Sequence, residues 1–287
     1  MAVGRRDRAP PRGGARARGA PLAAPLARGS RRAGAQLVGA VPQTVVVVPC
    51  FNEAARLDDA SFLALAAAPG IGVLFVDDGS TDGTAARLAS LAARGDGAIT
   101  ALSLPGNAGK GEAVRRGLRE ALEGGATTIG YVDADLSTPV PEVLRLLAEM
   151  ERRHAVVVMG ARVALLGTAI ARRAHRHYLG RLFATAASLV LGVRVYDTQC
   201  GAKFFRDTPA VRHALATPFA SRWAFDVELI GRLLQGDPPL RPADFVEIPL
   251  QRWIDVSGSK IGPLQMVRTA WDLAVIAVRY HVRKRVP

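Results

Sequence analysis

Short apolar runs and longer amphipathic stretches alternate along most of the chain. The runs at 45–48 and 72–76 consist almost entirely of apolar residues, which is typical of strands buried on both faces of a sheet. Strands are predicted at 45–48, 72–76, 99–104, 128–132, 155–159 and 245–249, with an extended segment at 195–205. Helices are predicted at 53–68, 84–93, 110–122, 139–152, 165–192 and 225–234.

This alternation of strands and helices predicts the fold class. Strands and helices that alternate through short loops form a mostly parallel sheet with helices on both faces, so an α/β, Rossmann-like architecture is expected. Ligands of such sheets bind beyond the carboxyl ends of the strands. Acidic clusters follow the predicted strands that end at 76 and 132. This edge of the sheet is therefore the expected functional site.

Residues 1–41 have a different composition from the rest. They are mainly Ala, Arg, Gly and Pro, so they cannot bury enough apolar surface to offset the entropy of ordering, and a disordered basic tail is predicted. Residues 1–40 contain nine Arg and one Asp, which account for +8 of the formal net charge of +13. The tail either contacts anionic lipid or nucleic acid or is a dispensable extension. The remaining chain lacks a basic platform with interleaved aromatic residues, so no nucleic-acid partner is expected.

Residues 263–287 are predicted to form a basic amphipathic helix. Apolar side chains recur there at three- and four-residue spacing, at Leu264, Val267, Trp271, Val275, Val278 and Val282. Such a helix either lies on an anionic membrane surface or packs against the sheet. No uninterrupted apolar segment has the length of a membrane span or resembles a signal peptide. Cys50 and Cys200 are predicted to be reduced thiols, so a cytoplasmic location is expected.

Two carboxylates follow the predicted strand at 128–132. Asp133 and Asp135 are two residues apart, and at the end of a strand both can face one side. Hard divalent cations bind to one or two carboxylates together with phosphate oxygens. The alternative is a pair of acids that form a turn or cap a helix.

Other polar residues at the same predicted edge suit a nucleotide. Asp77 and Asp78 follow the strand at 72–76 and could accept hydrogen bonds from a base or a ribose, or could simply stabilise the loop. Asn52 and Glu53 follow the first strand and could line the same pocket. Lys110 lies between two glycines at a helix start, either facing a phosphate or solvated at a turn.

Four segments occur in an order that resembles family 2 glycosyltransferases of the GT-A fold. They are Pro49-Cys50-Phe51-Asn52-Glu53, Val76-Asp77-Asp78-Gly79-Ser80-Thr81-Asp82-Gly83-Thr84, Gly106-Asn107-Ala108-Gly109-Lys110-Gly111 and Asp133-Ala134-Asp135. Two later segments are similar to the dolichyl-phosphate β-glucosyltransferase branch of polyprenyl-phosphate glycosyltransferases. They are Asp197-Thr198-Gln199-Cys200-Gly201-Ala202-Lys203 and Arg222-Trp223-Ala224-Phe225-Asp226-Val227-Glu228. The resemblance implies a GT-A domain at 42–262, with a nucleotide half at 42–136 and an acceptor half at 137–262.

The resemblance also implies roles for individual residues. The nucleotide-sugar site would include Pro49, Asn52, Glu53, Asp77, Asp78, Lys110 and Asp133. Asp133 and Asp135 would hold Mg²⁺ or Mn²⁺, with Asp135 also counted as catalytic. Arg162, Arg173 and Arg176 would bind the phosphate of the acceptor. Asp226 would be a catalytic carboxylate that either takes a proton or binds sugar hydroxyls.

The activity implied by this resemblance is an inverting transfer of a hexose to a polyprenyl or dolichyl phosphate, giving a β-linked product. The first choice of donor is UDP-glucose, and the alternative donors are GDP-mannose and UDP-GlcNAc. The alternative acceptor is a soluble compound or a secondary metabolite. A phosphate monoester has a second pKa of about 6, so it is a nucleophile at neutral pH without a general base. Such an enzyme would act peripherally at the inner face of the cytoplasmic membrane.

Overall fold

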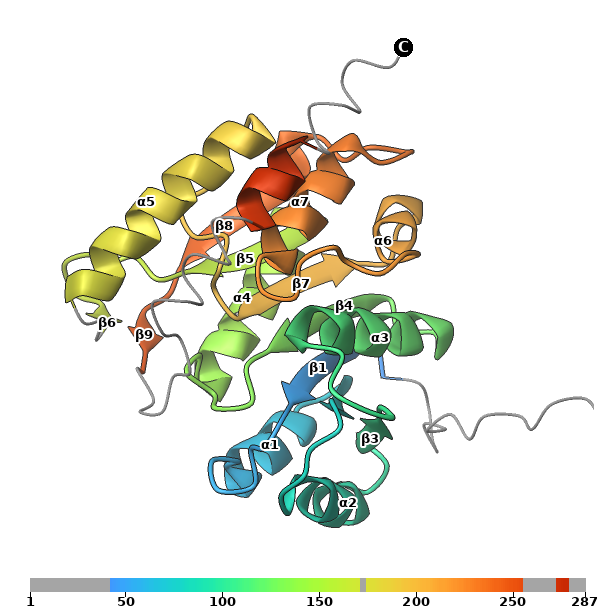
Figure 1. The fold of residues 1–287 in the computed structure, drawn as a ribbon. Helices are drawn as coiled ribbons and strands as arrows, with labels where there is room; N and C mark the ends of the chain where they lie inside the picture. The colour runs from blue at the N-terminus through green and yellow to red at the C-terminus, as the bar shows by residue number, and fades with distance from the viewer. Residues whose placement is uncertain (1–41, 171–173, 255–271, 279–287) are drawn as a thin grey trace, which may run out of the picture. The chain divides into compact units, whose positions relative to one another are not determined.

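The computed structural model describes residues 42–170, 174–254 and 272–278, with the backbone alone for 174–179. Its central sheet has seven strands in the order β3-β2-β1-β4-β7-β5-β8 (Figure 1). These strands are β1 (Thr44–Cys50), β2 (Ile71–Asp77), β3 (Ile99–Ser103), β4 (Thr128–Val132), β5 (Val157–Ala161), β7 (Ala202–Arg206) and β8 (Phe245–Pro249). A separate pair joins β6 (Ala169–Ile170) to β9 (Arg252–Trp253).

Helices cover both faces of the sheet because its strands are apolar on both sides. Val46 and Val48 of β1 belong to one core and Val45 and Val47 to the other. The first core packs α1 (Asp59–Ala66), α2 (Thr84–Arg94) and α4 (Val140–Arg153) on the sheet. The second packs α3 (Lys110–Glu123), α5 (Ala174–Leu191), α6 (Pro209–Ala214) and α7 (Phe225–Gln235) on the opposite face.

One strand of the sheet runs against the others. β7 is antiparallel to both of its neighbours, β4 and β5, and Ala202 at its start lies opposite Val132 at the end of β4. The chain that enters β7 therefore meets the carboxyl end of β4. This topology places the segment around Gly201 beside Asp133.

Most predicted strands are confirmed, and two predicted helices are partly wrong. The helix predicted from 53 begins at Asp59, because the preceding residues form turns and the side chain of Asp58 accepts a hydrogen bond from the Ser61 amide as the N-cap. The helix predicted from 165 is described only as Ala174–Leu191. Before it, Gly167 has a φ of 85°, which no helix accommodates.

The chain ends lie largely outside the described residues, including the predicted tail at 1–41 and most of the predicted helix at 263–287. Residues 272–278 of that helix are helical. Leu273 and Ile276 are buried in the second core, whereas Val278 from the predicted apolar stripe is 63% exposed. Within the described ranges, none of the helices is both long and apolar enough to span a bilayer.

Candidate active site

The carboxyl end of β4 carries the two carboxylates predicted to hold a metal. Oδ1 of Asp135 accepts hydrogen bonds from the amide and the hydroxyl of Ser137, at 3.0 and 2.8 Å. Asp133 differs, because among the described residues its buried Oδ1 meets no backbone amide or hydroxyl group and pairs instead with the Lys110 ammonium 2.6 Å away. The lysine side chain is flexible, so this carboxylate can exchange its partner for a bound cation without disturbing the backbone.

Gly201 packs against the backbone and the side chain of Asp133. The amide of Asp133 donates to the carbonyl of Gly201 at 3.1 Å. A Cβ atom on Gly201 would lie 2.0 Å from Oδ2 and 2.3 Å from Cγ of Asp133, far inside van der Waals contact. The glycine is therefore required for the observed position of the carboxylate.

Lys110 begins α3 and lies among acidic side chains. Burial alone would lower the pKa of Lys110, but attraction to Asp133, Asp226 and Asp135 and the hydrogen bond to Asp133 outweigh it, so the pKa is raised. The lysine is therefore a cation at neutral pH. It stands at the N-terminus of a helix, where backbone amides also favour anions, so it can exchange Asp133 for a phosphate.

The end of β2 uses its acids differently. Both oxygens of Asp78 are occupied, accepting hydrogen bonds from the amides of Ala108 at 2.7 Å and Gly109 at 2.8 Å. Asp77 accepts from the amide of Ser80 at 3.0 Å. Gly109 can take its φ of 96° because it has no side chain. Asp78 thus fixes the loop that precedes Lys110.

The residues predicted after β1 stabilise the neighbouring loop. Asn52 has a left-handed backbone conformation with a φ of 55°. Its side-chain oxygen accepts a hydrogen bond from the Thr81 backbone amide at 2.9 Å, and its backbone amide donates to the hydroxyl of Ser80. Glu53 forms a bidentate ion pair with Arg56. Pro49 lies within β1 and is half-buried. These three residues are beside Asp78, at the same edge of the sheet as Asp133.

Asp226 lies in a buried polar network at the start of α7. Its Oδ1 accepts a hydrogen bond from the hydroxyl of Tyr131 and is 2.6 Å from the ammonium of Lys203. Lys203 is fully buried and also donates to the carbonyl of Cys200 at 2.6 Å. Burial, followed by the charge of Asp226, raises the pKa of Tyr131 well above its ordinary value, so the phenol stays protonated as the donor.

Arg162, predicted to bind the acceptor phosphate, follows β5 and is clasped by Asp197. Its Nε and Nη2 donate to the two carboxylate oxygens at 2.7 and 2.8 Å. Burial would lower the pKa of Arg162, but the charge of Asp197 raises it overall. The other predicted phosphate ligands are not tested, because Arg173 and the side chain of Arg176 lie outside the described residues.

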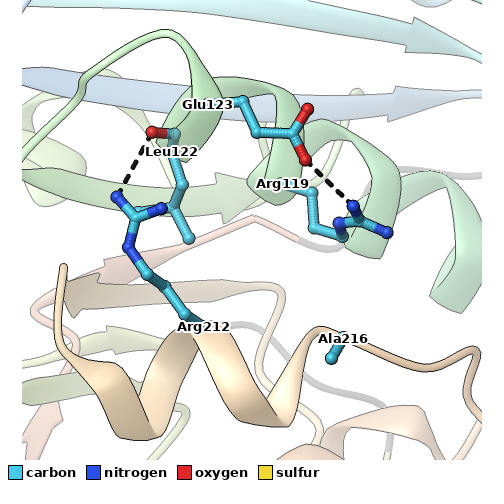
Figure 2. A pocket seen from close by; sticks show the side chains of 5 residues that line it. All are labelled: Arg119, Leu122, Glu123, Arg212 and Ala216. Carbon is cyan, nitrogen blue, oxygen red and sulfur yellow. Dashed lines mark hydrogen bonds and ion pairs between the residues drawn. The ribbon is translucent and has the colours of Figure 1, made fainter.

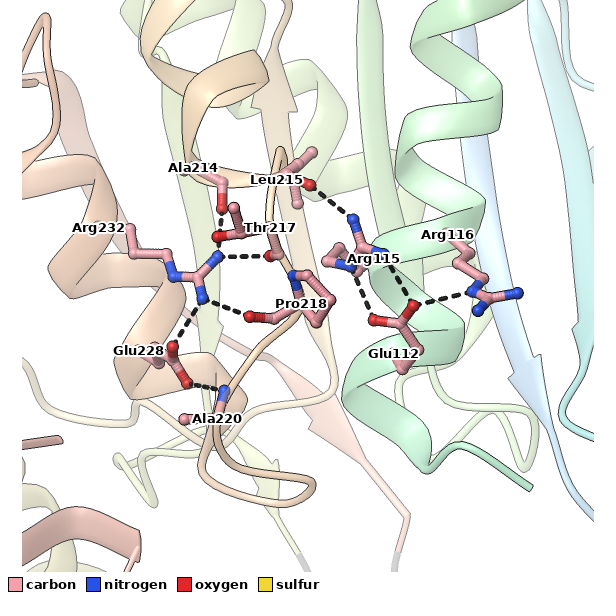
Figure 3. A network of polar contacts seen from close by, with 10 residues as sticks. All are labelled: Glu112, Arg115, Arg116, Ala214, Leu215, Thr217, Pro218, Ala220, Glu228 and Arg232. Carbon is pink, nitrogen blue, oxygen red and sulfur yellow. Dashed lines mark hydrogen bonds and ion pairs between the residues drawn. The ribbon is translucent and has the colours of Figure 1, made fainter. Parts of the chain in front are cut away.

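The segment before Asp226 is held in place by two arginines (Figure 3). Arg115 of α3, only 5% exposed, donates to the carbonyl of Leu215 and pairs with Glu112. Arg232 of α7 donates to the carbonyls of residues 214, 217 and 218 and pairs with Glu228. Residues 215–220 are thereby tied to α3 and α7, the two helices that begin at the candidate site.

A separate pocket lies at the other end of α3 (Figure 2). It is lined by Arg119, Leu122, Glu123, Arg212 and Ala216. Arg119 pairs with Glu123, and Arg212 pairs with Asp207, so neither charge is left for a ligand. At 1.5 Å per helical residue the pocket is about 15–20 Å from Lys110, and it is not part of the candidate site.

The residues at the end of β4 fit a divalent cation bound together with a substrate. In the parts of the chain that are described, no three His, Cys, Asp or Glu side chains converge as a closed metal site. Mg²⁺ uses one or two carboxylates when the phosphates of a substrate complete its coordination, and Asp133 and Asp135 could supply them. The pairing of Asp133 Oδ1 with a lysine side chain, and with no backbone amide among the described residues, supports this fit.

The sequence analysis missed the residues that support the site. The sequence motifs include Lys203 but assign it no role, and they do not point to Tyr131 or Glu247. A lysine within the apolar strand at 202–206 was the available signal, because a buried ammonium requires a carboxylate partner. The identity of that partner, Asp226, depends on the fold.

The arrangement of the chain matches solved structures of a known enzyme class. Glucosyl-3-phosphoglycerate synthase from Mycobacterium tuberculosis, in complex with Mn²⁺, UDP-glucose and phosphoglyceric acid, aligns with a TM-score of 0.60 and 19% identity, over 82% of this chain and 79% of that chain. The predicted α/β GT-A fold is thereby confirmed.

The chain belongs to glycosyl transferase family 2, whose model matches residues 45–212. Dolichyl-phosphate beta-glucosyltransferase of Drosophila melanogaster is 32% identical over 268 residues, covering 83% of this chain and 75% of the relative. The Homo sapiens protein of the same name is 32% identical over 83% of this chain and 76% of its own. Polyprenol monophosphomannose synthase of Mycolicibacterium smegmatis is 27% identical over 80% of this chain and 87% of its own. The resemblance stated from the sequence is confirmed, and the protein is a glycosyltransferase.

Proposed function

We propose that this protein transfers glucose from UDP-glucose to a polyprenyl phosphate with inversion, giving a β-linked lipid-phosphate sugar. The names of the relatives at about 32% identity support the acceptor and the sugar. In the reaction, an oxygen of the acceptor phosphate forms a bond to the anomeric carbon while the bond from that carbon to the donor diphosphate breaks. UDP is the leaving group.

The observation that carries this proposal is the buried Oδ1 of Asp133, paired only with Lys110. A bound Mg²⁺ or Mn²⁺ would supply positive charge for the departing diphosphate. Asp133 and Asp135 would hold that ion. Lys110, released from Asp133 when the ion binds, would turn to the diphosphate, and the nucleotide would lie over the ends of β1 and β2, beside Asn52, Glu53 and Asp78.

The acceptor phosphate needs cations rather than a base. Asp197 holds the guanidinium of Arg162 through Nε and Nη2, and we propose that the remaining nitrogen, Nη1, binds the phosphate. We propose that Arg173 and Arg176 complete this site. Since a phosphate dianion is already nucleophilic, Asp226, buried against Tyr131 and Lys203, acts as a positioning residue rather than as a general base.

The proposed acceptor is a lipid, so the enzyme would work at the cytoplasmic face of a membrane as a peripheral protein. The basic residues of the predicted tail at 1–41 and of the predicted C-terminal helix would favour binding to an anionic membrane surface. A soluble acceptor is the alternative outcome of the test below.

A donor and acceptor screen tests the proposal. The purified protein is incubated with Mn²⁺ or Mg²⁺ and with labelled UDP-glucose, UDP-GlcNAc or GDP-mannose, offered either a polyprenyl phosphate in detergent or a soluble phosphate ester such as phosphoglyceric acid. We expect label from UDP-glucose in the organic phase, and none after EDTA. Transfer to the soluble ester alone would refute the lipid acceptor, and transfer from another donor would refute the assigned sugar.

A further inference from the structure

Two buried polar atoms without a hydrogen-bond partner belong to the loop that reaches the end of β4. Among the described residues, four buried side-chain atoms have neither a hydrogen bond nor an ion pair: Thr198 Oγ1, Gln199 Nε2 and both amide atoms of Gln235. Gln235 ends α7, about 13 Å along the helix from Asp226. Thr198 and Gln199 belong to the loop that ends at Gly201, whose carbonyl accepts a hydrogen bond from the amide of Asp133.

The loop that carries Thr198 and Gln199 is firmly held through other groups. Glu247 of β8 accepts hydrogen bonds from the amides of Tyr196 and Asp197. Asp197 accepts from the amide of Gln199 at 3.1 Å, and Lys203 donates to the Cys200 carbonyl. The backbone is therefore fixed, while Thr198 Oγ1 and Gln199 Nε2 make no hydrogen bond to any described residue. Groups that are held rigidly but left unpaired are typical of ligand-binding positions.

The position of the loop indicates which ligand it faces. At its end, Gly201 contacts the carboxylate of Asp133, which belongs to the proposed diphosphate side. At its beginning, Asp197 clasps Arg162, which belongs to the proposed acceptor side. The group that lies between a donor diphosphate and an acceptor phosphate is the sugar in transfer.

We propose that the Thr198 hydroxyl and the Gln199 amide bind hydroxyl groups of the transferred hexose and so determine which sugar is accepted. This inference rests on the proposed function. Both side chains are neutral, which suits sugar hydroxyls, whereas phosphates are better matched by cations such as Lys110 and Arg162. Thr198 is 1% exposed and Gln199 is half-buried, so a hydroxyl that reaches them is shielded from competing water.

The first part of the test is stability. Thr198→Val and Gln199→Met keep the size of each side chain and remove an unpaired polar group, so neither is expected to lower Tm. Gln235→Met is the matched control, since it removes the same kind of orphaned amide far from the site. A Tm that falls by several degrees in Thr198→Val or Gln199→Met, but not in Gln235→Met, would show that these groups serve the fold and would overturn the proposal.

The second part is discrimination among donors. Binding of UDP-glucose and its 2-, 3-, 4- and 6-deoxyglucose analogues is measured by calorimetry with Mn²⁺ and without acceptor. Wild type and Gln235→Met should bind at least one deoxy donor about tenfold more weakly than UDP-glucose, whereas Thr198→Val or Gln199→Met should lose that difference and bind UDP unchanged.

The outcomes separate this inference from the proposed function. Variants that discriminate among the deoxy donors as wild type does would refute the role of Thr198 and Gln199 while leaving the donor assignment intact. Variants with normal donor discrimination but a raised KM for the acceptor would assign the loop to the acceptor phosphate instead. A wild-type protein that binds no UDP-sugar would refute the proposed donor, and this inference with it.

Discussion

The ends of β2 and β4 carry the same chemistry and use it in opposite ways. At the end of β2, both oxygens of Asp78 are bound to backbone amides of the loop before α3. At the end of β4, the buried Oδ1 of Asp133 has only the ammonium of Lys110 as its counterpart. The first carboxylate holds a loop in place, and the second is the one proposed to bind a ligand.

This difference teaches that an acid after a strand is informative only when its partners are known. Asp78 contacts the loop whose helix presents Lys110, and Lys110 contacts Asp133. The carboxylate at β2 therefore supports the cation that balances the carboxylate at β4. Four experiments test whether this division between support and ligand binding is correct.

Asp135→Asn should have the largest effect, because it removes charge from the proposed metal ligands. We expect kcat to fall by about 10³-fold, the scale of several kcal/mol of lost transition-state stabilisation. The hydrogen bonds from Ser137 can still be accepted by the amide oxygen, so Tm should change little. Full activity of Asp135→Asn without added metal would show that β4 does not differ from β2 in the proposed way.

The support beneath β4 is tested through Lys203 and Asp226. Removing one member of a buried ion pair leaves an uncompensated charge and costs about 3–5 kcal/mol, so Lys203→Met and Asp226→Asn should each strongly lower the free energy of unfolding in urea. The double variant should lose less than the sum of the two. Additive losses would show that the two residues do not act as a pair.

The activity of the double variant then decides the role of Asp226. A positioning role predicts that the pH profile of kcat keeps its shape while the concentration of Mn²⁺ needed for half-maximal rate rises. Loss of one limb of the pH profile would identify Asp226 as a general base.

The sequence predicted the strands more accurately than it predicted the residues that support the candidate site. The strands at 128–132 and 245–249 have the predicted bounds, because continuous apolar runs leave few alternatives for a doubly buried strand. The direction of β7 could not be predicted, since an antiparallel strand has the same local pattern as a parallel one. Lys203 pairs with Asp226 only because of that direction.

The same limit applies to the acids. The spacing placed Asp78 and Asp133 at one edge of the sheet, and the structure agrees. The spacing could not indicate that the backbone amides of residues 108 and 109 donate to Asp78, because these contacts depend on the path of a loop about thirty residues away. The partners of each acid are set by the tertiary structure, and they distinguish the supporting acid, Asp78, from Asp133, which is proposed to bind a ligand.

Asp78→Ala tests the supporting role at β2. Asp78 is 3% exposed, and its loss leaves two backbone amides without acceptors, so we expect the free energy of unfolding to fall by about 2–3 kcal/mol. Asp78→Asn, which keeps one acceptor oxygen, should recover about half of this loss. An Asp78→Ala protein with wild-type stability and a raised KM for the donor alone would mean that β2, like β4, binds the ligand directly.

Gly201→Ala sharpens the comparison at the smallest scale, because it alters only the position of the Asp133 carboxylate. The added Cβ would lie 2.0 Å from Oδ2, so the side chain of Asp133 must move, and we expect the Mn²⁺ concentration for half-maximal activity to rise about tenfold. Gly83→Ala is the control at the end of β2, since its Cβ would meet only the Cβ of Ala54, at 3.8 Å. It should leave the metal requirement unchanged. Equal effects of the two substitutions would mean that the position of the β4 carboxylate does not set the metal requirement, and the distinction between the two strand ends would then rest on Lys110 alone.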